Sequence, residues 1–189
     1  RLVVDNIHRV NASLSAISDG QLDTVVDVRS HEEFNDLSND INATVDTLKR
    51  YIADAAARLD AELAFAKAIQ HSAMPSVFPP YPGRKEFDIY ASMDPAKEVG
   101  GDFYDFFLVS DNKLGMTMAD VSGKGIPAAM YMMMAKSMIK TKMISGAKPA
   151  DALMSVNNLL CDSNQGEMFV TVWAAVLDMD RNELIAADA

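Results

Sequence analysis

Two short segments rich in glycine and aspartate restrict the fold of this chain more than any other feature. They read Glu98-Val99-Gly100-Gly101-Asp102-Phe103-Tyr104-Asp105 and Ala119-Asp120-Val121-Ser122-Gly123-Lys124-Gly125. Between them, aromatic and β-branched residues, a turn-like Ser110–Lys113 and a second apolar run predict a β-hairpin. Asp102 enters the first strand and Asp120 leaves the second, so antiparallel pairing is expected to bring both carboxylates to one end of the sheet.

Oxygen ligands at one end of a sheet, beside glycines that let the backbone approach closely, suit a hard divalent cation. An aspartate next to a glycine more often serves only to form a turn, so one such segment would be weak evidence for a functional site. Two segments in register at one hairpin end favour a cation site formed by Asp102 and Asp120. Asp105 is a weaker candidate, which either lies next to the ligands or fixes the turn.

The two segments resemble the PPM-type metal-dependent serine/threonine phosphatases, in their bacterial SpoIIE-like branch. The resemblance extends over about residues 60 to 189 and also rests on three further segments: Ala68-Ile69-Gln70-His71-Ser72-Ala73-Met74-Pro75, Pro127-Ala128-Ala129 and Met168-Phe169-Val170-Thr171. It implies that Asp102 and Asp120 are catalytic and bind two Mg²⁺ or Mn²⁺ ions. The backbone carbonyl of Val121 would be a further metal ligand.

The resemblance also implies a reaction and a substrate. Two cations lower the pKa of a bridging water, and the resulting hydroxide attacks the phosphorus of phosphoserine or phosphothreonine in line. Members of the family carry further metal-binding aspartates, which are expected beyond Ala189, so the activity is expected of the whole protein. The expected substrate is a phosphorylated partner protein, commonly an anti-sigma-factor antagonist of the STAS type.

Apolar residues in the first part of the chain follow a heptad spacing. The first series is Val3, Ile7, Val10, Leu14 and Ile17, and the second is Phe34, Leu37 and Ile41. This spacing predicts two helices that pack against partners, separated by an extended connector over Gln21–Ser30. The pattern resembles a HAMP domain over residues 1–53, although an ordinary dimerising helical hairpin stays open.

The HAMP resemblance has consequences for assembly and location. HAMP domains are dimeric four-helix coiled coils that pass signals from a membrane segment to an output domain, so a homodimer is expected. A transmembrane helix is expected before Arg1, which would place this part of the protein on the cytoplasmic side of the cell membrane. The chain would then belong to a signal-regulated membrane receptor.

The apolar series continues from Val45 and predicts one long helix over residues 34–73, which Pro75 ends. Two successive steps of four residues, from Leu37 to Ile41 to Val45, shift the phase of this series. Residues 54–75 are interpreted as a coiled-coil linker that couples the HAMP-like module to the next domain.

Residues 76–189 are interpreted as the PPM-type domain, incomplete at its C-terminal end. Further strands are predicted at Phe87–Ala91, Met168–Asp178 and Glu183–Asp188, and helices at Ala128–Ile144 and Pro149–Cys161. Strands in short antiparallel hairpins flanked by helices predict an α+β sandwich.

Composition limits the possible partners and chemistry. A net charge of −10 argues against nucleic acid and anionic lipid, which require clustered lysine and arginine. The single cysteine, Cys161, cannot form an internal disulfide, and no arginine-bearing loop follows it as a cysteine-based phosphatase would need. Two alternatives to an active enzyme stay open: an inactive phosphatase-fold binding module, and a chain that acts chiefly as a dimeric signalling coiled coil.

Overall fold

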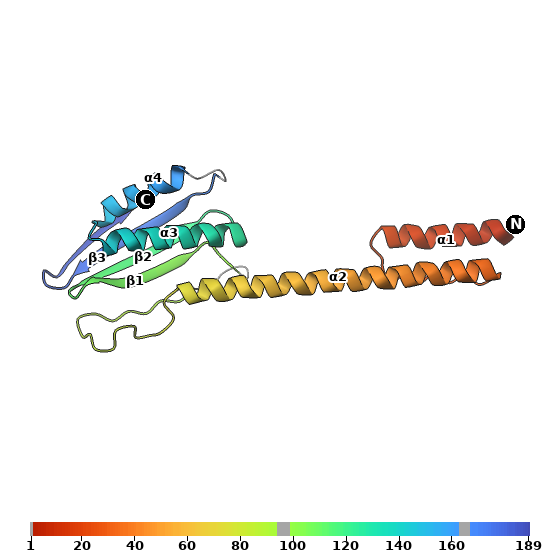
Figure 1. Ribbon diagram of the computed structural model, residues 1–189, viewed down its shortest axis with the longest axis horizontal. Helices are drawn as coiled ribbons and strands as arrows, with labels where there is room; N and C mark the ends of the chain where they lie inside the picture. The colour runs from red at the N-terminus through yellow and green to blue at the C-terminus, as the bar shows by residue number, and fades with distance from the viewer. Residues whose placement is uncertain (1, 94–98, 163–166) are drawn as a thin grey trace. The chain divides into compact units, whose positions relative to one another are not determined.

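The computed structural model describes residues 2–93, 99–162 and 167–189, and its chain divides into two compact units, Arg1–Ala61 and Glu62–Ala189 (Figure 1). Glu98, the first residue of the first acidic segment, lies outside the described residues. None of the described helices combines the length and the apolar character that crossing a membrane requires.

The first unit contains helix α1, Leu2–Ser18, and the N-terminal part of helix α2, Glu32–Ala73. The predicted order of helix, extended connector and helix is confirmed, as is a single helix over residues 34–73. The connector supplies Val26 and Val28 to a small apolar core with Val10 of α1. Ile17, Phe34 and Ile41 of the two heptad series pack against this core.

Polar side chains of α2 hold the connector by its backbone. The Asn42 side chain accepts a hydrogen bond from the Val26 N–H at 2.9 Å and donates one to the Val26 carbonyl at 3.0 Å. The Ser38 hydroxyl lies 3.4 Å from both the nitrogen and the oxygen of Val28. The connector is therefore extended without pairing to another strand, because side chains satisfy the groups that a strand neighbour would otherwise bind.

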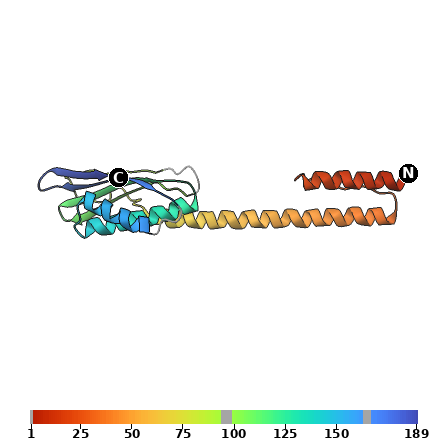
Figure 2. The same ribbon diagram turned by 90° about the horizontal axis from the view of Figure 1, so that it is seen from above.

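The second unit is built on a four-stranded antiparallel sheet of order β1-β2-β3-β4. Its strands are β1, Phe103–Ser110; β2, Lys113–Val121; β3, Val170–Asp178; and β4, Glu183–Asp188. Helices α3, Ile126–Ile144, and α4, Pro149–Asp162, cover one face of this sheet (Figure 2). The predicted hairpin and the antiparallel α+β arrangement are confirmed.

The core of the second unit lies between the two helices and the sheet. Buried side chains of α3, such as Met132 and Met143, contact apolar residues that alternate along the strands, such as Phe103 and Phe107. Met74, just after α2, belongs to the same cluster. The C-terminal end of α2 is thus packed onto the domain that carries the two acidic segments.

The prediction of a strand at Phe87–Ala91 is wrong. These residues pair with no strand, and β1 is an edge strand of the sheet. Burial nevertheless alternates over this segment, with half-buried Phe87 and Ile89 and exposed Asp88 and Tyr90. Ring contacts connect it to β1, because Phe78 packs on both Tyr90 at 5.2 Å and Phe106 at 5.7 Å between ring centroids. The alternation therefore records packing against the sheet and not ladder hydrogen bonds.

Candidate metal centre

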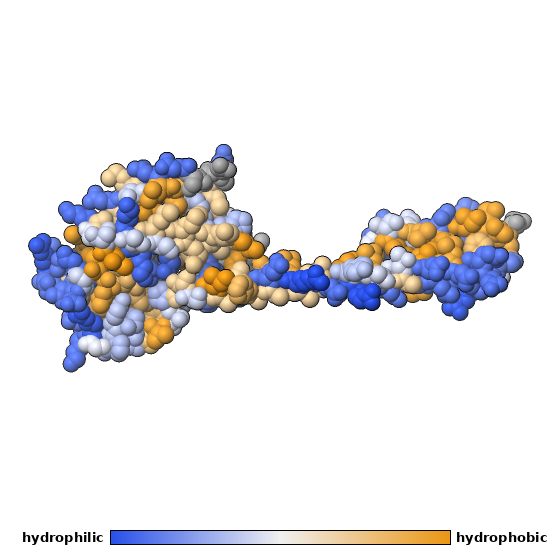
Figure 3. Space-filling model, in the orientation of Figure 1, coloured by the Kyte–Doolittle hydropathy of each residue, from blue (hydrophilic) through white to orange (hydrophobic). Residues whose placement is uncertain are grey.

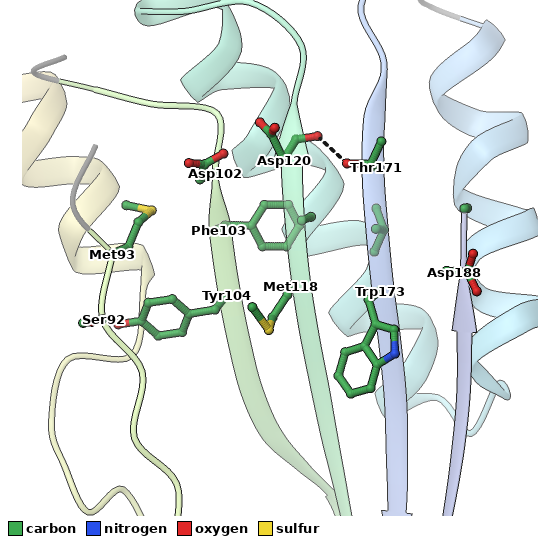
Figure 4. A pocket seen from close by; sticks show the side chains of 13 residues that line it. Ser92, Met93, Asp102, Phe103, Tyr104, Met118, Asp120, Thr171, Trp173 and Asp188 are labelled. Atoms are coloured by element: carbon green, nitrogen blue, oxygen red, sulfur yellow. Dashed lines mark hydrogen bonds between the residues drawn. The ribbon is translucent and has the colours of Figure 1, made fainter. Parts of the chain in front are cut away.

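The two aspartates expected to form a cation site lie at the same end of the β1–β2 hairpin. The register pairs Phe103 with Ala119, so Asp102 and Asp120 are the next residues outward on the two strands. Figure 4 shows their carboxylates close together at the top of the sheet. Both residues are exposed to solvent, so an ion or a phosphate group can reach them.

The Asp120 carboxylate changes the titration of its neighbour. The pKa of Asp102 is raised above its usual value, first by the hydrogen-bonding interaction with the Asp120 side chain, then by partial burial and by the negative charge of Asp120. Like charges held together disfavour the ionised form, and a cation between them removes that cost. Paired carboxylate oxygens are also the ligands that Mg²⁺ and Mn²⁺ prefer, so these residues fit a divalent cation.

The carboxylate pair is a partial site by itself. Among residues 2–93, 99–162 and 167–189, no group of three or more His, Cys, Asp or Glu side chains is placed to hold a metal ion. Asp188 lines the same pocket but lies on β4, away from the pair in Figure 4. Further oxygen ligands would therefore come from the backbone, from water or from residues outside the described part of the chain.

Gly101 brings the backbone before Asp102 directly against the end of β2. A Cβ atom at position 101 would lie 2.7 Å from the Val121 carbonyl oxygen and 2.8 Å from the Val121 Cβ. Only glycine fits at that distance without a backbone shift. The carbonyl expected to be a further ligand therefore lies beside the segment that carries Asp102.

Hydrogen bonds to β3 fix the end of β2 that carries Asp120. The Thr171 hydroxyl donates to the Asp120 carbonyl at 3.4 Å, drawn as a dashed line in Figure 4. The Ser122 N–H donates to the Phe169 carbonyl at 2.8 Å, and the Phe169 N–H donates to the Ser122 hydroxyl at 2.9 Å. These bonds extend the β2–β3 pairing past Val121 and hold Asp120 at the sheet end.

The pair opens onto a pocket of about 760 Å³ on the sheet face that carries Tyr104, Met118 and Trp173, with the helices behind the sheet in Figure 4. Its walls combine aromatic, thioether, hydroxyl and carboxylate side chains, among them Ser92, Met93, Tyr104, Met118, Thr171 and Trp173. The carboxylate pair thus lies at the edge of an open pocket.

Asp105 does not lie at this site, which corrects the weaker candidate. It sits within β1 on the face toward α3, is 2% exposed, and its Oδ2 lies 2.7 Å from Lys136 Nζ and 3.3 Å from Lys140 Nζ. Its Oδ1 also accepts a hydrogen bond from the Phe106 N–H at 3.0 Å. Strand alternation puts Asp105 on the same buried face as Phe103 and Phe107, so its carboxylate connects the sheet to α3.

Part of the second unit is similar to a known protein family. The family model described as Stage II sporulation protein E (SpoIIE) matches residues 110–189. Residues 110–189 are therefore similar to part of a SpoIIE-type domain. The matched residues include Asp120 and most of the sheet, from β2 to β4, whereas Asp102 precedes them.

The chain is also similar to a protein named as a phosphatase. Over 108 residues, 57% of this chain and 32% of the relative, the chain is 33% identical to "Phosphoserine phosphatase RsbU" of Bacillus subtilis (strain 168). Over 159 residues, 80% of this chain and 24% of the relative, it is 32% identical to "Protein IcfG" of Synechocystis sp.. The chain thus spans about a third and about a quarter of these proteins.

A solved structure shares the fold. The SiaA-PP2C domain of Pseudomonas aeruginosa superposes with a TM-score of 0.60 and 23% sequence identity, covering 72% of this chain and 55% of that one. At this identity the likeness establishes a PP2C-like fold, which agrees with the helix and sheet order described above.

Proposed function

We propose that the protein is a metal-dependent serine/threonine protein phosphatase in which Asp102, Asp120 and the Val121 carbonyl hold divalent cations. The observation that carries this proposal is the meeting of two carboxylates at one sheet end, where Asp120 disfavours ionisation of Asp102. Similarity of the chain to a phosphoserine phosphatase and to a SpoIIE family model supports the same reaction class.

The residues of the chain have separate tasks in this proposal. When bound, two Mg²⁺ or Mn²⁺ ions would supply hydroxide near neutral pH and neutralise charge on the phosphate. Asp102 and Asp120 bind the ions, and Gly101 lets the two segments approach. Cys161 lies on α4, which packs on the opposite face of the sheet, so it is not placed to act as a nucleophile here.

We further propose that the activity is regulated by a dimeric, HAMP-like module over residues 1–53 and a linker over residues 54–75. Supporting this, the first unit exposes apolar side chains that a second copy would bury, and Figure 3 shows orange surface over this unit. The exposed apolar residues include Leu2, Val3, Ile7, Leu37 and Leu48. The proposed setting is the cytoplasmic side of a membrane receptor, with a phosphorylated STAS-type partner as substrate.

The direct test compares the whole wild-type protein with its Asp102→Asn variant in Mn²⁺-dependent dephosphorylation of a phosphoserine protein. We expect the variant to lose at least about 100-fold in turnover, because one anionic ligand of the site is lost. Asp111→Asn is the matched control, since Asp111 is exposed in the turn at the opposite end of the same hairpin. Equal turnover in wild type and Asp102→Asn would remove Asp102 from the metal site.

An inactive binding module is the second candidate, since the described residues supply two carboxylates without a third. It predicts that the protein binds a phosphoprotein but releases no phosphate at any Mn²⁺ concentration. The third reading, a chain that is chiefly a signalling coiled coil, predicts a stable dimer for residues 1–75 alone, which sedimentation measures.

A further inference from the structure

A buried glutamine of α2 binds the backbone two residues before Asp102. Gln70 is 3% exposed, its Nε2 donates to the Gly100 carbonyl at 2.6 Å, and its Oε1 accepts from the Gly100 N–H at 3.2 Å. One side chain thus satisfies both polar groups of a residue that has no side chain of its own. This is the pattern that a neighbouring strand would provide, supplied here by a helix.

The segment that carries Asp102 has buried side chains at both of its ends, Val99 at 1% exposed and Phe103 at 3%, but not at the two glycines between them. Gly100 and Gly101 offer no side chain for packing, and glycine backbones are the most permissive in a chain. Gly101 is limited by its close approach to Val121. Without the Gln70 bonds, the direction in which the chain leaves Gly100, and therefore the position of Asp102, would vary more widely.

Residues directly after α2 also contact the chain on the other side of Asp102. The Tyr104 hydroxyl donates to the Pro75 carbonyl at 2.8 Å, and Met74 packs in the apolar cluster that includes Phe103. Figure 1 shows the C-terminal end of α2 next to the start of β1. Asp102 therefore lies between two attachments to the same helix end, at Gly100 and at Tyr104.

We propose that Gln70 is a positioning residue for the carboxylate pair: its amide holds Gly100 so that Asp102 faces Asp120. Gln70 does not touch the ions or the substrate. Its effect on metal affinity rests on the proposed function, whereas its effect on the Gly100 backbone does not.

The test uses the Gln70→Met variant, which keeps the length and volume of the side chain and removes both hydrogen bonds. Hydrogen exchange at the Gly100 amide is measured by NMR in the metal-free protein. We expect about tenfold faster exchange, the size of effect that loss of a hydrogen bond produces. Ser72→Ala is the matched control, because Ser72 is exposed near the same end of the helix and donates to the Ile69 carbonyl within it.

A second measurement follows metal binding. The Mn²⁺ concentration for half-maximal phosphatase activity is expected to rise about tenfold in Gln70→Met, while turnover at saturating Mn²⁺ changes less than about twofold. Gln70→Glu keeps the acceptor for the Gly100 N–H and is expected to fall between wild type and Gln70→Met in both measurements. A side chain that acts only by filling space would leave Gln70→Met equal to wild type.

Unchanged Gly100 exchange in Gln70→Met, or exchange in Gln70→Glu as fast as in Gln70→Met, would overturn the positioning role. The two proposals fail separately. Absence of Mn²⁺-dependent hydrolysis in the wild type would reject the phosphatase, while the exchange of Gly100 would still decide whether Gln70 holds this segment.

Discussion

Each unit of this chain contains a helical amide that binds an extended backbone at both its N–H and its carbonyl. In the first unit Asn42 binds Val26, and in the second Gln70 binds Gly100. The bound residues differ completely. Val26 is 1% exposed and contributes a side chain to the apolar core with Val10, whereas Gly100 has no side chain to bury.

This difference separates stabilising a fold from positioning a site. Burying a valine contributes about 1.5–3 kcal/mol and a hydrogen bond about 0.5–1.5 kcal/mol, so apolar contacts are the larger restraint on the connector of the first unit. At the two glycines directly before Asp102, which have no side chain to bury, hydrogen bonds and the close contact at Gly101 are the restraints, next to the buried Val99. The same arrangement therefore holds a backbone in one unit and directs a carboxylate in the other.

The largest expected difference between the units concerns their ion pairs. Lys136 and Asp105 in the second unit are both buried, whereas the Lys49–Asp23 pair in the first unit is exposed. Lys136→Met is expected to lower the free energy of unfolding by about 3 kcal/mol, because it leaves a buried carboxylate with the more exposed Lys140 as its remaining cation. Lys49→Met should change it far less, since exposed ion pairs contribute little. Urea denaturation measures both, and similar small losses would contradict a buried pair.

Glycine also has a different role in each unit. Gly20, after α1, has φ of +90° and open space where a Cβ would point, so Gly20→Ala strains only the backbone, by about 1 kcal/mol. Gly101→Ala forces a Cβ against Val121 and should lower the free energy of unfolding by about 2 kcal/mol. Only Gly101→Ala should also raise the Mn²⁺ requirement. An unchanged Mn²⁺ requirement would show that the approach of the two segments is not needed for the site.

The elements with strong local signals could be predicted from the sequence. Turn residues at Ser110–Lys113 and the apolar runs on both sides predicted the hairpin, and the hairpin placed Asp102 beside Asp120. The helical spacing of apolar residues, together with Pro75, predicted α2. These features depend on neighbours close in sequence, which is why patterns were sufficient.

The sequence prediction that was wrong and the contacts that were missed depend on residues far apart in the chain. Alternation at Phe87–Ala91 reports which side chains are covered but not whether a strand lies alongside. Asp105 and its partner Lys136 are 31 residues apart, and Gln70 and Gly100 are 30 apart. A carboxylate on an otherwise apolar strand face, between Phe103 and Phe107, was the available signal that Asp105 is buried and needs a partner of opposite charge.

A smaller effect tests whether the two amide contacts act independently. Asn42→Ala removes both bonds to Val26 and should lower the free energy of unfolding by about 1–2 kcal/mol, while Val26 and Val28 keep the connector packed. Chemical denaturation measures this loss. Exchange at the Gly100 amide should be unchanged, in contrast to Gln70→Met. Faster exchange at Gly100 in Asn42→Ala would contradict a local role for each contact.

The smallest expected effect has opposite signs in the two units. Without metal, the raised pKa of Asp102 means that the folded state binds this proton more tightly than the unfolded state, so stability falls as pH rises from 3.8 through the folded pKa. Asp102→Asn should therefore raise the free energy of unfolding in EDTA at pH 7, by about a few tenths of a kcal/mol after solvent screening.

Lys49 lowers the pKa of Asp23 in the first unit. The stabilisation from this ionised carboxylate is present above pH 3.8 and is lost as pH falls through its folded pKa. Asp23→Asn should accordingly lower the free energy of unfolding at pH 7. Urea denaturation in EDTA measures both variants, and a loss for Asp102→Asn as well would mean that the carboxylates do not repel each other.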